Sequence, residues 1–120
     1  YLWLSNPVAI EYIRNCLKRV RKRDSALLMA SQNLEDFDQE GVREMTKPLF
    51  AIPPHQFLFN PGSIGRRFYM DMLQLDEAEF ELIRHARRGE CLFKCGAERY
   101  LLEVKAPPHK AALFGTAGGR

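Results

Sequence analysis

The sequence predicts an α/β protein of one domain that ends in a β-hairpin. Two short runs rich in apolar residues, Ala26–Ala30 and Gln56–Asn60, are bounded by turn residues, which is typical of strands buried in a sheet. Helix-period segments lie before, between and after these runs, and the last third of the chain alternates instead. Strands separated by helices favour an α/β sheet. We expect residues 1–114 to form the domain and residues 115–120 a disordered tail.

Composition is that of an ordinary globular domain. The chain has 120 residues, 46% of them hydrophobic and 28% charged, and its formal net charge of +3 is unlike that of a histone. No apolar run approaches the roughly 20 residues that span a bilayer, and the pattern of a signal peptide is missing. Three cysteines are too few for a disulfide framework, so a reducing cytoplasm is the simplest setting.

The first helix is predicted to begin at Pro7, after an apolar start. Asn6 can cap it, and proline suits the first helical position because the amide it lacks has no partner there. Since the chain opens with Tyr1 in place of Met and continues with apolar residues, we expect a piece of a longer protein. The apolar stripe of this helix, which we expect to face the sheet, consists of Ala9, Ile13, Cys16, Leu17 and Val20.

The end of this helix is strongly basic. Six of the ten residues from Arg14 to Arg23 are Lys or Arg, and cations near a helix C-terminus suit its dipole. Two interpretations stay open. The basic run forms a solvated helix face, or it contacts the phosphates of a nucleic acid, which needs clustered Lys and Arg but no base-reading groups.

The predicted strand Ala26–Ala30 ends in a polar group that includes Gln32. Ligands of open α/β sheets bind beyond the carboxyl ends of the strands. Gln32 is therefore a candidate site residue, and an ordinary strand-end residue is the alternative.

Three helices are expected in the middle of the chain. Glu40–Lys47 is predicted to end near Pro48, and Ile64–Leu73 forms the next helix. Asp76 and Glu79 match a capping box, and Leu75 and Phe80 a hydrophobic staple, so a further helix should begin there. It is expected to run to about Arg87 and to stop at Gly89.

The last third of the chain predicts a β-hairpin, with strands at 91–95 and 100–104 around Gly96-Ala97-Glu98. Cys91 and Cys95 have the spacing of half a metal site, but alternation also places both on one strand face and no second cysteine pair exists. We expect no metal site. The three histidines have no Cys or carboxylate at ligand spacing, and we assign them no role; they are His55, His85 and His109.

The common nucleotide and metal motifs are missing from the sequence. It contains no phosphate-binding loop of the G-x-x-x-x-G-K-[ST] type, no G-x-G-x-x-G and no H-E-x-x-H. Arg66 and Arg67 follow a glycine-rich turn, where they either bind an anion at a helix start or simply lead the loop into the helix.

The order of these motifs resembles that of the conjugative-transfer ATPases of type IV secretion systems, the TrsE/TraE-like, VirB-type members of the HerA–FtsK group of RecA-like motors. In that family a few apolar residues follow the Walker B acids. A helix ending in Arg-Lys comes next, and then a buried strand closing in Thr-Gln or Ser-Gln. The matching residues here are Tyr1–Leu4, Arg21-Lys22 and Ser31-Gln32. The elements up to Leu113-Phe114 follow the family's order, so the resemblance spans nearly the whole chain.

This resemblance implies the C-terminal portion of a RecA-like P-loop ATPase sheet, with a role for three residues. Gln32 resembles the polar sensor, whose amide both donates to a phosphate and accepts from water. Arg21 resembles the arginine finger offered to a neighbouring subunit's nucleotide, and Lys22 is a further candidate at that interface. The family's phosphate loop and Walker B acids would precede Tyr1, so we expect no ATP hydrolysis by this chain alone.

The resemblance also implies cofactors and partners for the longer parent. The parent would use ATP and Mg²⁺, whereas none is expected for this chain alone. It would assemble as a hexamer with other secretion-channel components at the cytoplasmic inner face of the bacterial membrane, without a membrane span, and DNA is a further candidate partner. The other function class is a non-enzymatic α/β interaction module whose basic helix binds a partner or nucleic acid.

Overall fold

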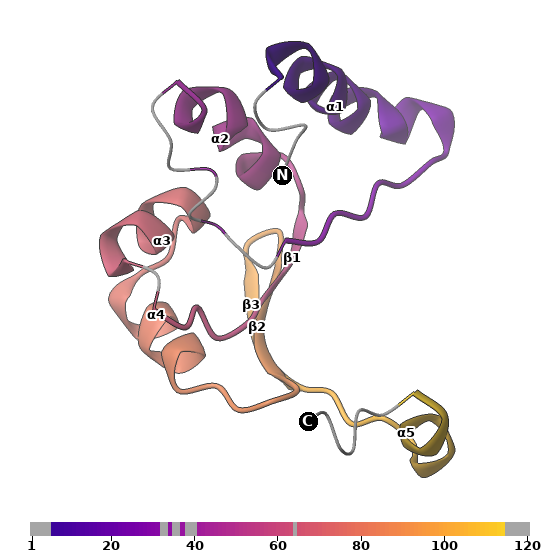
Figure 1. The fold of residues 1–120 in the computed structure, drawn as a ribbon, viewed down its shortest axis with the longest axis vertical. Helices are drawn as coiled ribbons and strands as arrows, with labels where there is room; N and C mark the ends of the chain where they lie inside the picture. The colour runs from indigo at the N-terminus through magenta and orange to yellow at the C-terminus, as the bar shows by residue number, and fades with distance from the viewer. Residues whose placement is uncertain (1–5, 32–33, 35–36, 38–40, 64, 115–120) are drawn as a thin grey trace.

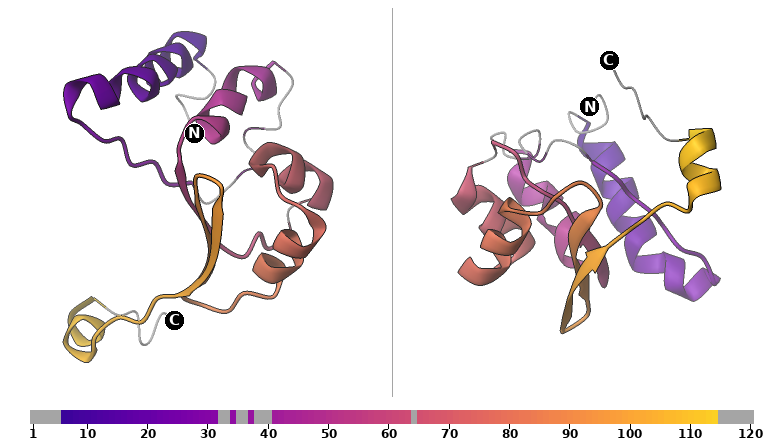
Figure 2. Two further views of the ribbon diagram at one scale, coloured as in Figure 1. Left: turned by 180° about the vertical axis from the view of Figure 1, so that it is seen from behind. Right: turned by 90° about the horizontal axis from the view of Figure 1, so that it is seen from below.

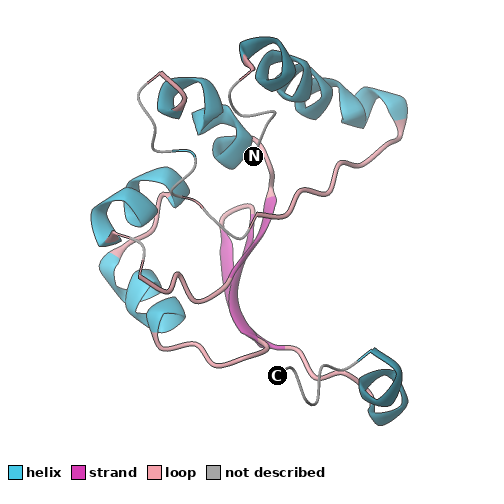
Figure 3. Ribbon diagram, viewed as in Figure 1, coloured by secondary structure: helices cyan, strands magenta, loops and turns pink. Residues whose placement is uncertain are grey.

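The computed structural model describes residues 6–31, 34, 37, 41–63 and 65–114 of the chain. Helices and strands alternate along it as the sequence predicts, with the strands gathered into one sheet (Figures 1 and 3). The elements are α1 (Pro7–Arg19), the 3₁₀ turn η1 (Val20–Arg23), α2 (Arg43–Ala51), β1 (His55–Leu58), α3 (Arg66–Leu73), α4 (Glu77–Arg84), β2 (Glu90–Cys95), β3 (Glu98–Glu103) and α5 (Pro108–Phe114).

The described sheet has three antiparallel strands in the order β1-β2-β3. The terminal hairpin is therefore confirmed, with Gly96 at a positive φ of 59° in its turn. The run predicted at Gln56–Asn60 forms β1 at His55–Leu58, and it pairs with the hairpin rather than with Ala26–Ala30. One sheet face carries a row of rings: Phe57 stacks on Phe93 at 4.5 Å between centroids, and Phe93 lies 6.2 Å from Tyr100.

The opposite face of the sheet carries the main core. Helices α3 and α4 lie against it, on the same side in both views of Figure 2. Leu58 and Leu92 pair across β1 and β2 and pack beneath Ile83, which is fully buried. The buried residues of this cluster are Leu58, Tyr69, Leu73, Leu75, Phe80, Ile83 and Leu92.

A second, smaller cluster joins the helices that precede the sheet. Helix α1 packs against α2, and Ile13 and Leu17 contact a cluster around Leu49 and Met72. The stripe of α1 thus faces α2, and our expectation that it faces the sheet is wrong. Ile10, which the predicted stripe omits, is the helix's one residue in the buried class.

Polar contacts hold the corner between α3 and α4 against the hairpin. The predicted capping box is confirmed: Glu79 N donates to Asp76 Oδ1 at 2.7 Å, and Asp76 N donates to Glu79 Oε2 at 3.0 Å. The other carboxylate oxygen of Glu79 accepts from Arg99 Nε on β3 at 2.7 Å. Lys94 Nζ on β2 donates to the carbonyl of Leu73, the last residue of α3, at 2.5 Å. The two predicted staple residues, Leu75 and Phe80, are both buried in the main cluster.

The segment Ala26–Ala30 is not the buried strand that the sequence predicts. It is extended, but it forms no strand and every residue in it is exposed; Leu28 is 92% exposed. The reason is that no described strand runs beside it, so its apolar side chains and backbone groups have nothing to pack against or pair with.

Two helix ends also differ from prediction. Helix α2 continues through Pro48 to Ala51, because the amide that proline lacks would have bonded only the carbonyl of exposed Glu44 in the first turn. Helix α4 ends at Arg84 rather than near Arg87, since the side chain of Asn60 donates to the carbonyls of Arg84 (2.9 Å) and Ala86 (3.2 Å). These bonds satisfy orphan carbonyls that a longer helix would have used.

The molecule is more open than a compact domain of its length. Its radius of gyration is 16.0 Å, whereas about 14 Å is typical of a compact chain of this size. Helix α5 stands apart from the sheet (Figures 1 and 2). The expected disordered tail at 115–120 lies outside the described residues, and the boundary drawn at residue 114 stays a prediction.

Gly89 offers a test of the hairpin's closure. Its φ is +90°, and a Cβ there would lie 2.8 Å from the carbonyl oxygen of Val104, whereas Gly96 has φ +59° and open space around it. We expect Gly89→Ala to lower the free energy of unfolding by about 2 kcal/mol or more, and Gly96→Ala by about 1 kcal/mol, because only the first adds a clash to the strained backbone. Urea denaturation measures both, and equal losses would contradict the close approach.

Candidate functional site

The basic end of α1 is built by a well-capped helix that tightens before it stops. Asn6 Oδ1 accepts from Val8 N at 3.0 Å and from Ala9 N at 3.4 Å, which confirms the predicted cap. After Arg19 the chain narrows into η1, and Asp24 leaves the helix in the left-handed region with φ 46°. The Ser25 amide then donates to the Val20 carbonyl at 3.1 Å. The basic run is therefore presented on a short, defined turn.

The structure places two of the three predicted site residues on this turn. Arg21 and Lys22 belong to η1, and both are exposed. Gln32 lies outside the described residues, so Arg21 and Gln32 are not brought together here. The outward direction expected for Arg21 agrees with its exposure.

Charge at this turn is unbalanced. Within the described part of the chain, no acidic side chain forms an ion pair with Arg19, Arg21, Lys22 or Arg23. Other arginines differ, as Arg99 does, whose Nε lies 2.7 Å from Glu79. The end of α1 thus offers positive charge to a group outside the chain.

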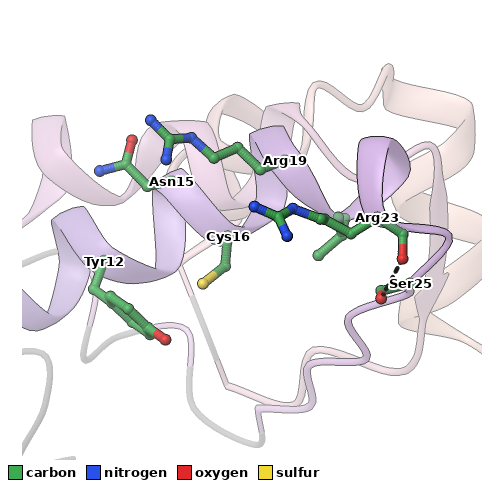
Figure 4. Close-up of a pocket in the computed structure, with 7 residues that line it drawn as sticks. Tyr12, Asn15, Cys16, Arg19, Arg23 and Ser25 are labelled. Carbon is green, nitrogen blue, oxygen red and sulfur yellow. Dashed lines mark hydrogen bonds between the residues drawn. The ribbon is translucent and has the colours of Figure 1, made fainter.

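A pocket of about 400 Å³ opens beside this turn (Figure 4). Arg19 and Arg23 both extend back along the helix, toward Asn15 and Cys16, and Tyr12 lies at the far end of the group. We did not single out this pocket from the sequence, although the helical spacing of Asn15, Arg19 and Arg23 places them on one face. The lining residues are Tyr12, Asn15, Cys16, Arg19, Val20, Arg23 and Ser25.

A second pocket, of about 260 Å³, surrounds the start of α3. Arg66 lines it, but Arg66 pairs with Glu77 and Glu81 and lies over the ring of Phe80 at 5.4 Å. Its charge is thus matched within the chain, which favours the plain loop-to-helix entry over an anion site.

The cysteines and the buried lysine sit in structural positions. Cys91 is fully buried on β2, and burial raises the pKa of its thiol. No three His, Cys, Asp or Glu side chains gather as a metal site in the described residues. Lys94 is also buried, and burial first and Arg99 second lower the pKa of its ammonium, while Glu79 raises it. Its bond to Leu73 gives it a structural role.

Comparison with known proteins decides the family. A probable conjugal transfer protein TrbE of Sinorhizobium fredii is 27% identical over 122 residues, which cover 98% of this chain and 18% of that protein. The conjugal transfer protein TrbE of Rhizobium radiobacter is 26% identical over 122 residues, which cover 98% and 14%. The structure of VirB4 of Thermoanaerobacter pseudethanolicus matches with a TM-score of 0.77 at 33% identity, over 87% of this chain and 28% of that one.

This chain is a relative of the TrbE and VirB4 conjugal-transfer proteins. The resemblance to type IV secretion ATPases, drawn from the order of short motifs, is thereby confirmed, although no protein-family model matches the chain. The chain spans less than a fifth of the length of the TrbE proteins that it matches. None of the helices in the described ranges is long and apolar enough to cross a membrane.

The segment between the basic turn and the rest of the TrbE-like chain has a measurable signature. Backbone amides of residues 26–30 donate to no described carbonyl, whereas those of β2 lie in the sheet's central strand. In hydrogen exchange followed by mass spectrometry at low protein concentration, we expect residues 26–30 to exchange near the rate of an unfolded chain and β2 to be protected by orders of magnitude. Protection of residues 26–30 equal to that of β2 would contradict the exposed, unpaired segment.

Proposed function

We propose that this chain is a portion of a conjugation or type IV secretion ATPase that powers DNA or protein transfer. The observation that carries the proposal is the agreement of two independent likenesses over nearly the same residues. TrbE proteins align with 98% of the chain, and the VirB4 fold covers 87% of it at a TM-score of 0.77. In this proposal, the chain is the C-terminal portion of the parent's RecA-like sheet, and Ala26–Ala30 becomes a paired strand in the parent.

Arg21 is proposed to act as an arginine finger in the parent. It stands on the exposed turn η1, and no described carboxylate neutralises it. An outward guanidinium is poorly placed for its own subunit's nucleotide but suits a neighbour's nucleotide across a ring interface. A planar, charged fork stabilises the charge of a transferring phosphoryl group, and Lys22, next to it, adds a point charge at the same interface.

Gln32 is proposed as the polar sensor of the same reaction, since its amide can donate to a phosphate oxygen and accept from a water. The chain's own residues fit ATP only partially. The unpaired cations at η1 suit phosphate, whereas the described residues bring together no carboxylate cluster of the kind that holds Mg²⁺. In the parent, ATP and Mg²⁺ would thus be held chiefly by the phosphate loop and Walker B acids, outside this chain.

Partners and place follow from the same proposal. The parent would form a hexamer, contact other secretion-channel components and work at the cytoplasmic inner face of the bacterial membrane. The relatives' description as conjugal transfer proteins supports this proposal. DNA contact is also proposed, because the basic turn offers the charge that backbone phosphates attract.

Replacing Arg21 in the full-length parent tests the finger. We expect Arg21→Ala to lower the ATP turnover rate by about 10³-fold or more while ATP binding stays nearly unchanged, because a finger acts on the transition state. Arg21→Lys should restore little, since an ammonium cannot reproduce the bidentate fork. Gln32→Ala should slow turnover as well. Steady-state ATPase assays and nucleotide titrations measure the two effects separately.

Mixed assemblies supply the control for this prediction. Arg21→Ala subunits keep their phosphate loop, and subunits with a broken phosphate loop keep Arg21. Mixing the two inactive proteins should recover some of the activity at interfaces where an intact loop meets an intact finger. Wild-type turnover by Arg21→Ala alone would remove the finger assignment and leave the basic turn as a solvated or nucleic-acid-facing surface.

Self-association of the 120-residue chain is a further prediction. Leu27, Leu28 and Met29 are 42%, 92% and 40% exposed on an extended segment, and an unpaired apolar edge recruits another chain. We expect sedimentation velocity to show dimers or larger species that increase with protein concentration, and a matched variant, Leu28→Asp, to shift them toward monomer. A single monomeric species at every concentration would count against it.

A further inference from the structure

The pocket beside η1 has the size and chemistry of a ligand site that the proposed finger does not use. Its volume of about 400 Å³ falls in the range of roughly 300–1,000 Å³ that small-molecule sites occupy. Arg21 does not line it. The pocket therefore lies on the same basic turn but presents a different set of side chains.

The pocket's charge favours an anion. Arg19 and Arg23 line it, and no acidic residue does. Neither arginine has an ion-pair partner in the portion of the chain that the structure describes. The pocket at the start of α3 is the internal comparison, because its arginines, Arg66 and Arg84, both face Glu81, at 3.6 Å and 3.5 Å. Of the two, only the pocket beside η1 keeps its positive charge unmatched.

The shape of the lining narrows the anion to one with a flat apolar portion. The guanidinium groups of Arg19 and Arg23 extend toward Asn15 and Cys16, so hydrogen-bond donors gather along the helix (Figure 4). Tyr12 lies at the other end of the group with 69% of its surface exposed. Arginine forks suit phosphate, and an exposed aromatic ring suits a base, whichever base it is.

We propose that this pocket binds one nucleotide unit, with its phosphate on Arg19 and Arg23 and its base against Tyr12. The unit is either a free mononucleotide or one residue of a single-stranded nucleic acid, since both present the same phosphate and base. The inference does not depend on the proposed ATPase parent, because all of these side chains belong to the described residues of this chain.

Binding assays on the 120-residue chain test the proposal. Two probes are titrated by fluorescence anisotropy at low salt: a fluorescent adenosine monophosphate and a fluorescent oligothymidylate. The double variant Arg19→Gln/Arg23→Gln should weaken both by about tenfold or more, since each charge-assisted bond is lost. The matched control, Arg67→Gln/Arg87→Gln, removes the same net charge from exposed arginines outside the pocket and should change affinity by less than about twofold.

Tyr12 separates stacking from charge alone. Tyr12→Ala should weaken binding by about fivefold or more, whereas Tyr12→Phe, which keeps the ring, should bind nearly as the wild type. Tighter binding of the oligonucleotide with a steep salt dependence assigns a single strand, and equal binding of the mononucleotide assigns a free nucleotide; both support the site. Equal losses in the pocket and control double variants, unchanged binding by Tyr12→Ala, or competition by inorganic phosphate as strong as by adenosine monophosphate would overturn the proposal.

Discussion

The contact between β2 and the corner of α3 and α4 is what the rest of the structure depends on. Leu92 and Ile83 bury the apolar portion of this contact, and Lys94 closes it by donating to the carbonyl of Leu73 at 2.5 Å. Glu79 then serves two elements at once, capping α4 at Asp76 and binding Arg99 on β3. Because Lys94 and Arg99 share the neighbourhood of one carboxylate, removal of Glu79 would leave two cations close together and one of them buried.

Local signals in the sequence predicted the elements whose causes are local. The Asn6 cap, the capping box of Asp76 and Glu79, and the hairpin around Gly96 depend on residues within a few positions of one another, and all three are present. The end of α4 depends instead on Asn60, which is distant in the chain and was invisible to helix periodicity. The burial of Ala26–Ala30 failed for a related reason, since a strand is buried only where other strands flank it.

The candidate site shows the same division. The basic run at the end of α1 is read directly from the sequence, and its exposure agrees with that reading. Its pocket was missed because it needs Tyr12, Arg19 and Arg23 on one helix face together with the return of the chain at Ser25. Cations at a helix C-terminus also stabilise the helix dipole, so Lys18 and Arg19 in its last turn have a structural use of their own.

The row of rings on the sheet bears on how firmly the strands are aligned. Phe57, Phe93 and Tyr100 stand opposite one another on one face, and Leu58 and Leu92 pair on the other. A slip of β1 by a single residue would exchange these faces, so Leu58 would leave the core and its neighbours would enter it. The ring row would then lose the 4.5 Å stack of Phe57 on Phe93. The two faces therefore select the same alignment, and a slipped strand would expose apolar side chains that invite aggregation.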